Sequence, residues 1–432
     1  MLWFDKKKTG GIAVLFGMSV VLSRCSDADA GAFGAASAQS VQREAEQTES
    51  GTPSSWETGD GQEASLSANT SQSINTYVSG ESVPLSALPE AVFQTDDGKL
   101  ILLGDKVILM NAATLETEIC REVTELDFSL QDISFWKFAE SEAEYLVMGN
   151  YLQMKKKEEG NFSFSSSSEE PQLMLIRFSK DLERLETLNI GEAMGANRGM
   201  SKYDFICNGT KLLCSSMEGF FLYDLETGIH TIYPMEETLL GIYAFGYMES
   251  TDRILFAAFY NDGTLPDSQC VLGSMRMDGT DLEYEKKQTQ EWGEIKCFEN
   301  FALIEDGKWN ENGEQASVFY YGADKKIKQW PLADEYAAVQ ASETGKYFAV
   351  QSRDWDEAGN STGYTVRIYT SDGGRLMQEI SCPFSEIGQN TMLCECIVSE
   401  KMEAIFLLLC DRETKTDARF QVVKFDSIVK ND

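Results

Sequence analysis

Short apolar runs alternate with tight polar turns from about residue 90 onward. The stretch FFLYDLETGIHTIYP, residues 220–234, shows the unit at its shortest: an apolar strand, an acidic turn that ends in glycine, and a second strand. Similar hairpins begin 46 to 67 residues apart, at Val107, Met174, Phe220, Val271, Ser317, Thr365 and Phe420. A period of about 40 to 50 residues made of short strands is typical of a β-propeller with four strands per blade. We therefore predict an all-β fold, a seven-bladed β-propeller.

Two further strand candidates lie between successive hairpins, as four-stranded blades require. In the third repeat they are KYDFIC and KLLCSS, residues 202–207 and 211–216. The consecutive apolar residues at 405–410 suit a strand that is buried between neighbouring blades. Six blades, eight blades and tandem β-sandwiches are alternatives that the turn spacing leaves open.

The seventh hairpin has a clear first strand, RFQVVKF, but almost no second strand before Asp432. Propellers avoid an exposed edge by borrowing a strand from the other end of the domain. The isolated segment SINTYVS, residues 73–79, precedes the first blade. We predict that this N-terminal strand closes the ring, which gives a propeller domain at residues 73–432.

The N-terminus has the layout of an export signal. Three lysines at positions 6–8 precede an uncharged stretch, residues 11–23, which has the length of a signal-peptide core and is shorter than the roughly 20 residues of a membrane span. The tetrapeptide LSRC, residues 22–25, resembles a bacterial lipobox except at Arg24, where a small residue is usual. The resemblance implies that residues 1–25 are a signal peptide and that Cys25 receives lipid.

Two alternatives to lipidation stay open. Cleavage at small residues near 28–30 or 36–38 would release a secreted protein, and an uncleaved signal would act as an anchor. All three outcomes place the body of the protein outside the cytoplasm, and we expect it on the outer face of the cytoplasmic membrane. Residues 26–72 are rich in Ser, Ala, Gly, Glu and Gln, and we predict a disordered tether there.

The chain carries 37 basic and 70 acidic side chains, for a formal charge of −33. Such a field repels nucleic acids and anionic lipids, so we predict no nucleic-acid partner and membrane contact only through the lipid anchor. The chain has a single histidine, His230, so a metal site with several histidine ligands is excluded. Any Ser-His-Asp triad would have to use His230, which lies in one of the predicted outer hairpins. We predict a monomer without a cofactor.

The turns of FLYDLETG, MRMDGTDLE and IYTSDGG resemble those in the outer hairpins of TolB-like and WD40-like propellers. There an acidic-glycine turn joins the third and fourth strands of a blade. The resemblance covers residues 85–430 as an architecture, although the Gly-His and Trp-Asp dipeptides of WD40 blades are not repeated. It implies a propeller fold and a general role in binding, and it assigns no functional residue.

Loop lengths suggest which face binds. If the strands of each blade are A to D, the B-to-C and D-to-A links share one face, which we call the long-loop face. Several B-to-C links are long and polar: 151–172, 261–269, 305–315, 352–363 and 410–418. Rigid scaffolds carry recognition on such loops. We therefore predict that the long-loop face is the binding surface.

Two tryptophans stand among polar residues on this face, in EDGKWNENG and SRDWDEAGN. An exposed Trp can stack on a sugar, a peptide side chain or a cation, and the alternative is that each ring caps its own blade. Asp354, Asp356 and Asn360 offer oxygen atoms to a calcium ion, but the full calcium-loop pattern is absent, and we predict no metal. The predicted binding residues are Asn261, Asp262, Asp306, Trp309, Arg353, Asp354, Trp355, Asp356 and Asn360.

Nine cysteines remain besides Cys25, and most of them lie in predicted strands. Spacing would allow bridges between Cys394 and Cys396 and between Cys207 and Cys214, but a core of this size does not need them.

The sequence thus predicts a binding or assembly module for a protein or glycan partner in the cell envelope. Two alternatives stay open. One is a hydrolase or lyase that uses carboxylates on the long-loop face or in the central channel, and the other is an accessory subunit of a membrane complex.

Overall fold

A computed structural model describes residues within the unit Ala68–Asp432. The described residues are 75–77, 82–122, 133–151, 172–193, 202–216, 219–236, 238–261, 269–288, 291–305, 317–332, 338–356 and 358–425. The predicted signal peptide with Cys25 and the predicted tether at 26–72 lie outside them. Within the described ranges, no helix combines the length and the apolar character that crossing a bilayer requires.

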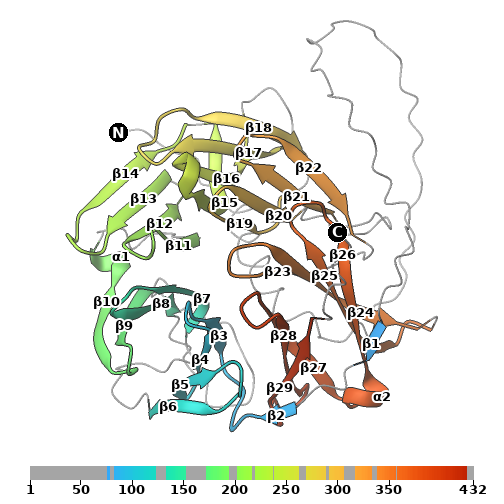
Figure 1. Cartoon of the computed structure of the whole chain (residues 1–432). Coiled ribbons are helices and arrows are strands. Elements are labelled where there is room, and N and C mark those ends of the chain that lie inside the picture. The colour runs from blue at the N-terminus through green and yellow to red at the C-terminus, as the bar shows by residue number, and fades with distance from the viewer. Residues whose placement is uncertain are drawn as a thin grey trace, which may run out of the picture. The chain divides into compact units, whose positions relative to one another are not determined.

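The described residues form seven antiparallel sheets that follow one another along the chain around a ring (Figure 1). The first three blades are β3 (Ala91–Gln94), β4 (Lys99–Leu103), β5 (Lys106–Asn111) and β6 (Thr117–Glu122); β7 (Ile133–Glu140), β8 (Glu144–Tyr151), β9 (Gln172–Ser179) and β10 (Arg184–Asn189); and β11 (Lys202–Ile206), β12 (Lys211–Ser216), β13 (Gly219–Asp224) and β14 (His230–Pro234).

The fourth and fifth blades are β15 (Leu239–Met248), β16 (Arg253–Tyr260), β17 (Gln269–Arg276) and β18 (Glu283–Gln288); and β19 (Ile295–Cys297), β20 (Phe301–Glu305), β21 (Ser317–Gly322) and β22 (Ile327–Pro331). The sixth contains β23 (Ala338–Ala341), β24 (Tyr347–Trp355), β25 (Ser361–Thr370) and β26 (Leu376–Pro383). The seventh contains β27 (Thr391–Ser399), β28 (Ala404–Asp411) and β29 (Arg419–Lys424).

The predicted all-β, seven-bladed propeller is therefore confirmed. Each predicted hairpin supplies the third strand of a blade, and six of the seven supply the fourth strand as well. Helical structure among the described residues is limited to the short segments α1 (Ile190–Ala193), α2 (Phe384–Ile387) and the 3-10 turn η2 (Glu249–Thr251).

Burial falls from the inside of a blade to its rim. The second strand of the seventh blade, β28, is buried at all but its last residue, which its apolar sequence AIFLLLCD permits. The outermost strand of the third blade, β14, is exposed at four of its five positions. Apolar residues in consecutive order therefore mark inner strands, and polar alternation marks the rim.

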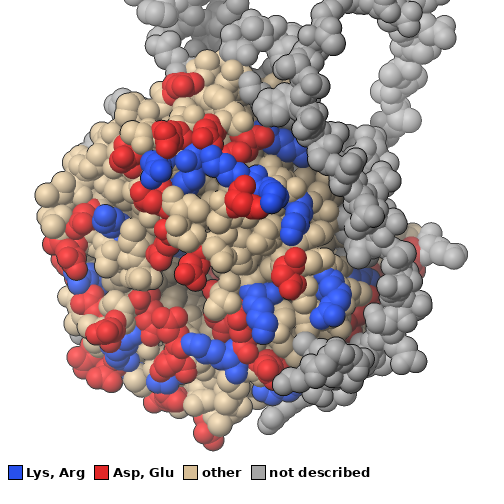
Figure 2. Space-filling model, turned by 45° about the horizontal axis from the view of Figure 1, so that its top comes forward, with Lys and Arg blue, Asp and Glu red and all other residues tan. Residues whose placement is uncertain are grey.

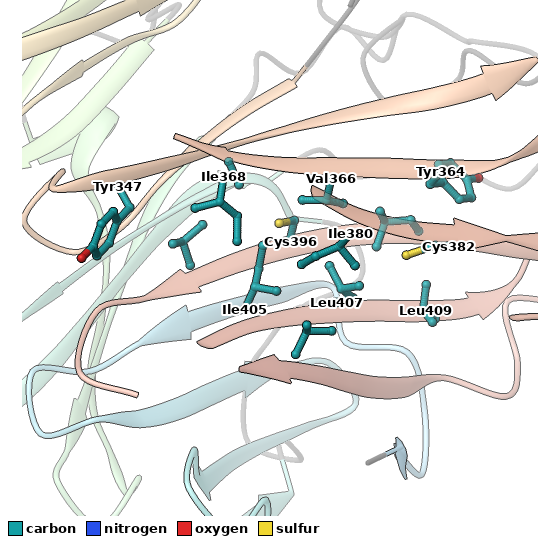
Figure 3. Close-up of a cluster of buried hydrophobic side chains, with 14 of the residues drawn as sticks. Tyr347, Tyr364, Val366, Ile368, Ile380, Cys382, Cys396, Ile405, Leu407 and Leu409 are labelled. Atoms are coloured by element: carbon teal, nitrogen blue, oxygen red, sulfur yellow. The ribbon is translucent and has the colours of Figure 1, made fainter. Parts of the chain in front are cut away.

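Buried hydrophobic side chains form one cluster at each interface between neighbouring blades, seven in all among the described residues. Figure 3 shows the cluster between the sixth and seventh blades, where Val366 and Ile380 face Ile405 and Leu407. Another cluster joins Phe406 of the seventh blade to Leu100 of the first blade. Packing therefore continues around the whole ring.

An N-terminal strand closes this ring, as predicted, but it is not the predicted segment. The strand β2 (Ser82–Pro84) pairs antiparallel with β29 and becomes the fourth strand of the seventh blade, with Val83 opposite Phe420. The Leu85 amide then donates a hydrogen bond to the Ala418 carbonyl at 2.7 Å. Pro84 donates no hydrogen bond, which suits an edge strand.

The predicted closing segment, 73–79, contains the strand β1 (Asn75–Tyr77), which lies elsewhere. It pairs in parallel with β26 and adds a fifth strand to the sixth blade, with Thr76 opposite Ile380. The assignment of 73–79 to the seventh blade was wrong because two short segments of similar strand character precede the first blade. Only the packing of Val83 and Leu85 against the cluster that contains Phe420 distinguishes them.

Candidate functional site

The long polar links all join the second and third strands of a blade and therefore share one face. Three predicted binding residues, Asp262, Asp306 and Trp309, lie in links outside the described residues. Asn261 directly follows β16, and its amide donates a hydrogen bond to the Thr238 carbonyl at 2.9 Å. The remaining candidates belong to the sixth blade.

The predicted link at 352–363 is shorter in the structure, because β24 continues to Trp355 and β25 already begins at Ser361. The Trp355 side chain is 59% exposed. The Arg353 guanidinium carbon lies 4.9 Å from the centroid of the Trp355 ring, and Arg353 Nε donates to Ser361 Oγ at 2.7 Å. Trp355 therefore does not cap its own blade, because its ring is open to solvent and carries a positioned cation.

The other three candidates in this hairpin hold its structure. Thr365 Oγ1 donates to Asp354 Oδ2 at 2.9 Å. Asp356 Oδ1 accepts from the Ala358 and Asn360 amides at 2.9 and 2.8 Å, and the Asn360 hydrogen bonds are the largest cause of a lowered pKa at Asp356. Asp354 is therefore hydrogen-bonded to Thr365, whereas Asp356 and Asn360 are hydrogen-bonded to each other, so the three side chains do not converge on one point. Within the described ranges, no group of three or more His, Cys, Asp or Glu side chains is arranged to hold a metal ion.

A second group of charged side chains lies on or just before the first strands of the blades, which surround the centre of the ring, with one member, Glu305, at the end of the second strand β20 (Figure 1). Lys137 Nζ of β7 lies 3.6 Å from Asp204 Oδ2 of β11 and 4.0 Å from Glu294 Oε1, just before β19. The second and fifth blades are not neighbours, so the Lys137–Glu294 pair bridges the centre. We call the following residues the axial cluster: Lys137, Lys202, Asp204, Glu294, Lys296 and Glu305.

Further contacts connect this cluster to the fifth and sixth blades. Lys296 Nζ lies 3.6 Å from Glu294 Oε2 and donates to the Val339 carbonyl at 2.5 Å. The Val339 amide in turn donates to Glu305 Oε1 at 3.3 Å. The Glu305 amide donates to the Glu294 carbonyl at 3.0 Å, so the two glutamates are adjacent.

Water reaches the axial cluster although protein surrounds it. The Lys137 and Asp204 side chains are 35% and 36% exposed, and that of Glu294 is 50% exposed. The Lys296 ammonium is the largest cause of a pKa of about 2 at Glu294. Burial, followed by the charge of Glu294, raises the pKa of Glu305 to about 7. Two adjacent carboxyl groups therefore have very different acidities, which is the arrangement of acid–base pairs in enzymes.

None of the six residues of the axial cluster was among the predicted binding residues. Their signal in the sequence is weak: one or two charged residues in each of several short strands that are otherwise mostly apolar, as in ISFWKFAE, KYDFI and IKC. His230 lies exposed on the rim strand β14, away from the first strand of its blade. A histidine-based triad at the centre of the ring is therefore not available.

Several cations on the described surface lie beside carboxylates. Figure 2 shows Lys and Arg side chains among Asp and Glu side chains on the face that it presents. Arg276 Nε, for example, is 2.9 Å from Asp281 Oδ2, and Lys99 Nζ is 2.9 Å from Asp97 Oδ2.

The structure contains no disulfide among the nine described cysteines, so neither suggested bridge, Cys394–Cys396 or Cys207–Cys214, is present in it. Cys396 is buried in the cluster between the sixth and seventh blades, whereas Cys394 Sγ lies 3.2 Å from Cys410 Sγ. The β-bulge beside Cys394 separates the two cysteines that strict alternation would place on one face of the sheet.

No protein-family model and no curated protein matches this chain. Among solved structures, it is similar to the β-propeller domain of Cps50 (Swd1) from Myceliophteria thermophila, with a TM-score of 0.50, 12% identity, and coverage of 80% of this chain and 100% of that one. It is also similar to TolB from Acinetobacter baumannii (TM-score 0.39, 12% identity, 77% and 78% covered). A third is an oligogalacturonate lyase in complex with manganese (TM-score 0.46, 9% identity, 80% and 86% covered). At these identities the likeness shows the propeller fold alone.

Proposed function

We propose that this protein is a binding or assembly module on the outside of the cell and that its long-loop face contacts a protein or glycan partner of the cell envelope. The observation that carries the proposal is the exposed Trp355 ring at the long-loop end of the sixth blade, with Arg353 stacked on it. Trp and Arg are enriched in the residues that dominate binding energy at interfaces.

The Trp355 ring is held ready for binding. Its neighbours in the hairpin are fixed by the Arg353–Ser361 and Asp354–Thr365 hydrogen bonds and by the Asp356–Asn360 turn. A preorganised aromatic side chain loses little conformational entropy when a partner binds. A sugar ring or a peptide side chain could stack on it, and the adjacent guanidinium would add a hydrogen bond to an oxygen atom of that partner.

The test of this surface is quantitative cross-linking and pull-down of the mature protein from its own cell envelope. We expect Trp355→Ala to reduce recovery of the partner about tenfold or more, since buried Trp anchors contribute 2 kcal/mol or more at interfaces. Ile232→Ala is the matched control, because Ile232 is also exposed, at 46%, but lies on the rim strand β14. Equal recovery with wild type and Trp355→Ala would contradict the proposal, and a partner that is an integral membrane complex would identify an accessory subunit.

The proposed location rests on the lipobox-like LSRC at residues 22–25. We expect a fatty-acid analogue fed to cells to label the wild-type protein and to leave Cys25→Ala unlabelled and released from the membrane fraction. Label that persists in Cys25→Ala, or none in the wild type, would rule out lipid attachment at Cys25.

A second candidate function, a carboxylate-dependent hydrolase or lyase, is favoured by Glu294 and Glu305. A carboxyl group with a pKa of about 7 can exchange a proton at neutral pH while its ionised neighbour stabilises positive charge. The test is incubation of wild type and Glu305→Gln with polysaccharides of the same envelope. Newly formed reducing ends or unsaturated products with wild type alone would support the enzyme, and their absence with both would favour the binding module.

A further inference from the structure

Two cysteines of the seventh blade meet across neighbouring strands. Cys394 lies on β27 and Cys410 on β28, and their sulfur atoms are 3.2 Å apart. Among the described cysteines, this is the one pair whose sulfur atoms are in such contact. The pair is not visible in the sequence, where fifteen residues separate the two positions.

The pairing of β27 with β28 explains this contact. Met392 lies opposite Cys410, so regular alternation places Cys394, two residues further on, on the same face of the sheet as Cys410. Leu393 lies opposite Leu409 and Glu395 opposite Leu408, so Cys394 is the extra residue of a β-bulge. The bulge moves Cys396 to the other face, toward the sixth blade, and leaves Cys394 diagonal to Cys410 on the neighbouring strand.

We propose that Cys394 and Cys410 form a disulfide in the exported protein, an inference that rests on the extracytoplasmic location proposed above. Closing the contact to a bond of about 2 Å requires only a small movement of the two side chains. The two thiols give up two protons and two electrons to the disulfide of a thiol–disulfide oxidoreductase, which is reduced to a dithiol. No other atom is gained or lost.

The bond forms most readily before the blade has closed. Cys410 is fully buried in the folded protein, and burial raises the pKa of Cys394, so little thiolate is available there once folding is complete. For the same reason a disulfide that has formed is protected from reduction.

The disulfide would brace the long-loop face. Cys394 and Cys410 lie at the base of the link between β28 and β29, which is further held by a 2.7 Å hydrogen bond from the Arg412 amide to the Asn390 carbonyl. Lys415 Nζ of the same link also contacts Met392 Sδ at 3.4 Å. A cross-link at this point fixes the end of β28 from which the link departs, and so preorganises the proposed binding surface.

Peptide mapping of the protein purified from its own envelope tests the proposal. Free thiols are alkylated in denaturant without reductant, and the protein is cut after Lys, Arg and Glu, which separates Cys394 from Cys396 at Glu395. We expect residues 387–395 linked to residues 404–412, with a mass about 2 Da below the sum of the two peptides. Alkylation of both peptides would overturn the proposal.

Two variants test which cysteines are cross-linked, and a treatment with oxidised glutathione separates a wrong pairing from a wrong cellular location. Cys394→Ala should leave Cys410 alkylated, and Cys396→Ala, two residues away and equally small, should retain the cross-link. Reduction of the wild type should lower the melting temperature by about 4 °C, as a loop of this size predicts, and should not change that of Cys394→Ala. If the envelope protein is reduced but the denatured, reduced chain forms the bond when it refolds with oxidised glutathione, the proposed location has failed; if neither forms it, the pairing itself is wrong.

Discussion

Replacing residues 82–85 with Gly-Ser-Gly-Ser should lower the melting temperature of the propeller by about 5 °C. The change removes the β2–β29 pairing and withdraws Val83 and Leu85 from the cluster that contains Phe420. Two half-buried apolar side chains and three or four backbone hydrogen bonds contribute about 4 kcal/mol together. A domain of roughly 350 residues has an unfolding entropy of about 0.7 kcal/mol/K, which converts this loss to about 5 °C.

The same replacement at residues 74–77 is the matched control. It removes β1, a three-residue strand added in parallel to the outer edge of the sixth blade, and leaves every blade with four strands. We expect a change of less than about 1 °C by differential scanning calorimetry. An equal loss from both replacements, or a larger loss at 74–77, would mean that β2 is not the strand that closes the ring.

The architecture was accessible from the sequence because each blade repeats a local pattern. An apolar strand, an acidic turn and a polar rim strand recur along the chain, and β13 and β14 reproduce the predicted hairpin at 220–234. Turn residues and the alternation of apolar and polar positions depend only on nearby residues, so they can be recognised without knowing which strands pair. The choice between β1 and β2 is different, because it depends on which segment packs against Phe420.

The candidate site was only partly accessible for the same reason. Trp355 was identified from its polar surroundings, but its exposure depends on how far β24 and β25 extend beyond their blade. The axial cluster was missed because Lys137 and Glu294 are about 160 residues apart and meet only across the closed ring. Cys394 was paired with Cys396 by strict alternation, which the bulge interrupts.

Glu305→Gln should stabilise the propeller at pH 8 by about 3 kcal/mol and leave its stability at pH 4 unchanged. The folded-state pKa of about 7 lies above the ordinary value of 4.5, so between these pH values the folded protein holds a proton that the unfolded chain has released. Glu305 therefore destabilises the folded protein progressively as pH rises from 4.5 to 7, and this loss of stability is complete above pH 7. Glutamine carries no charge, and its carbonyl oxygen can still accept the Val339 amide.

Glu294→Gln should change the stability of the folded protein at pH 8 in the opposite direction. Its pKa of about 2 lies below the ordinary value, so the ionised carboxylate stabilises the folded state above pH 4.5, and this contribution disappears as pH falls toward 2. The substitution should therefore lower the melting temperature at pH 8, where it leaves Lys296 and Lys137 without this carboxylate. Thermal melts of both variants between pH 4 and pH 8 check the pair. A loss of stability in Glu305→Gln at pH 8, or a gain in Glu294→Gln, would contradict the charge arrangement of the axial cluster and, with it, the basis of the enzymatic alternative.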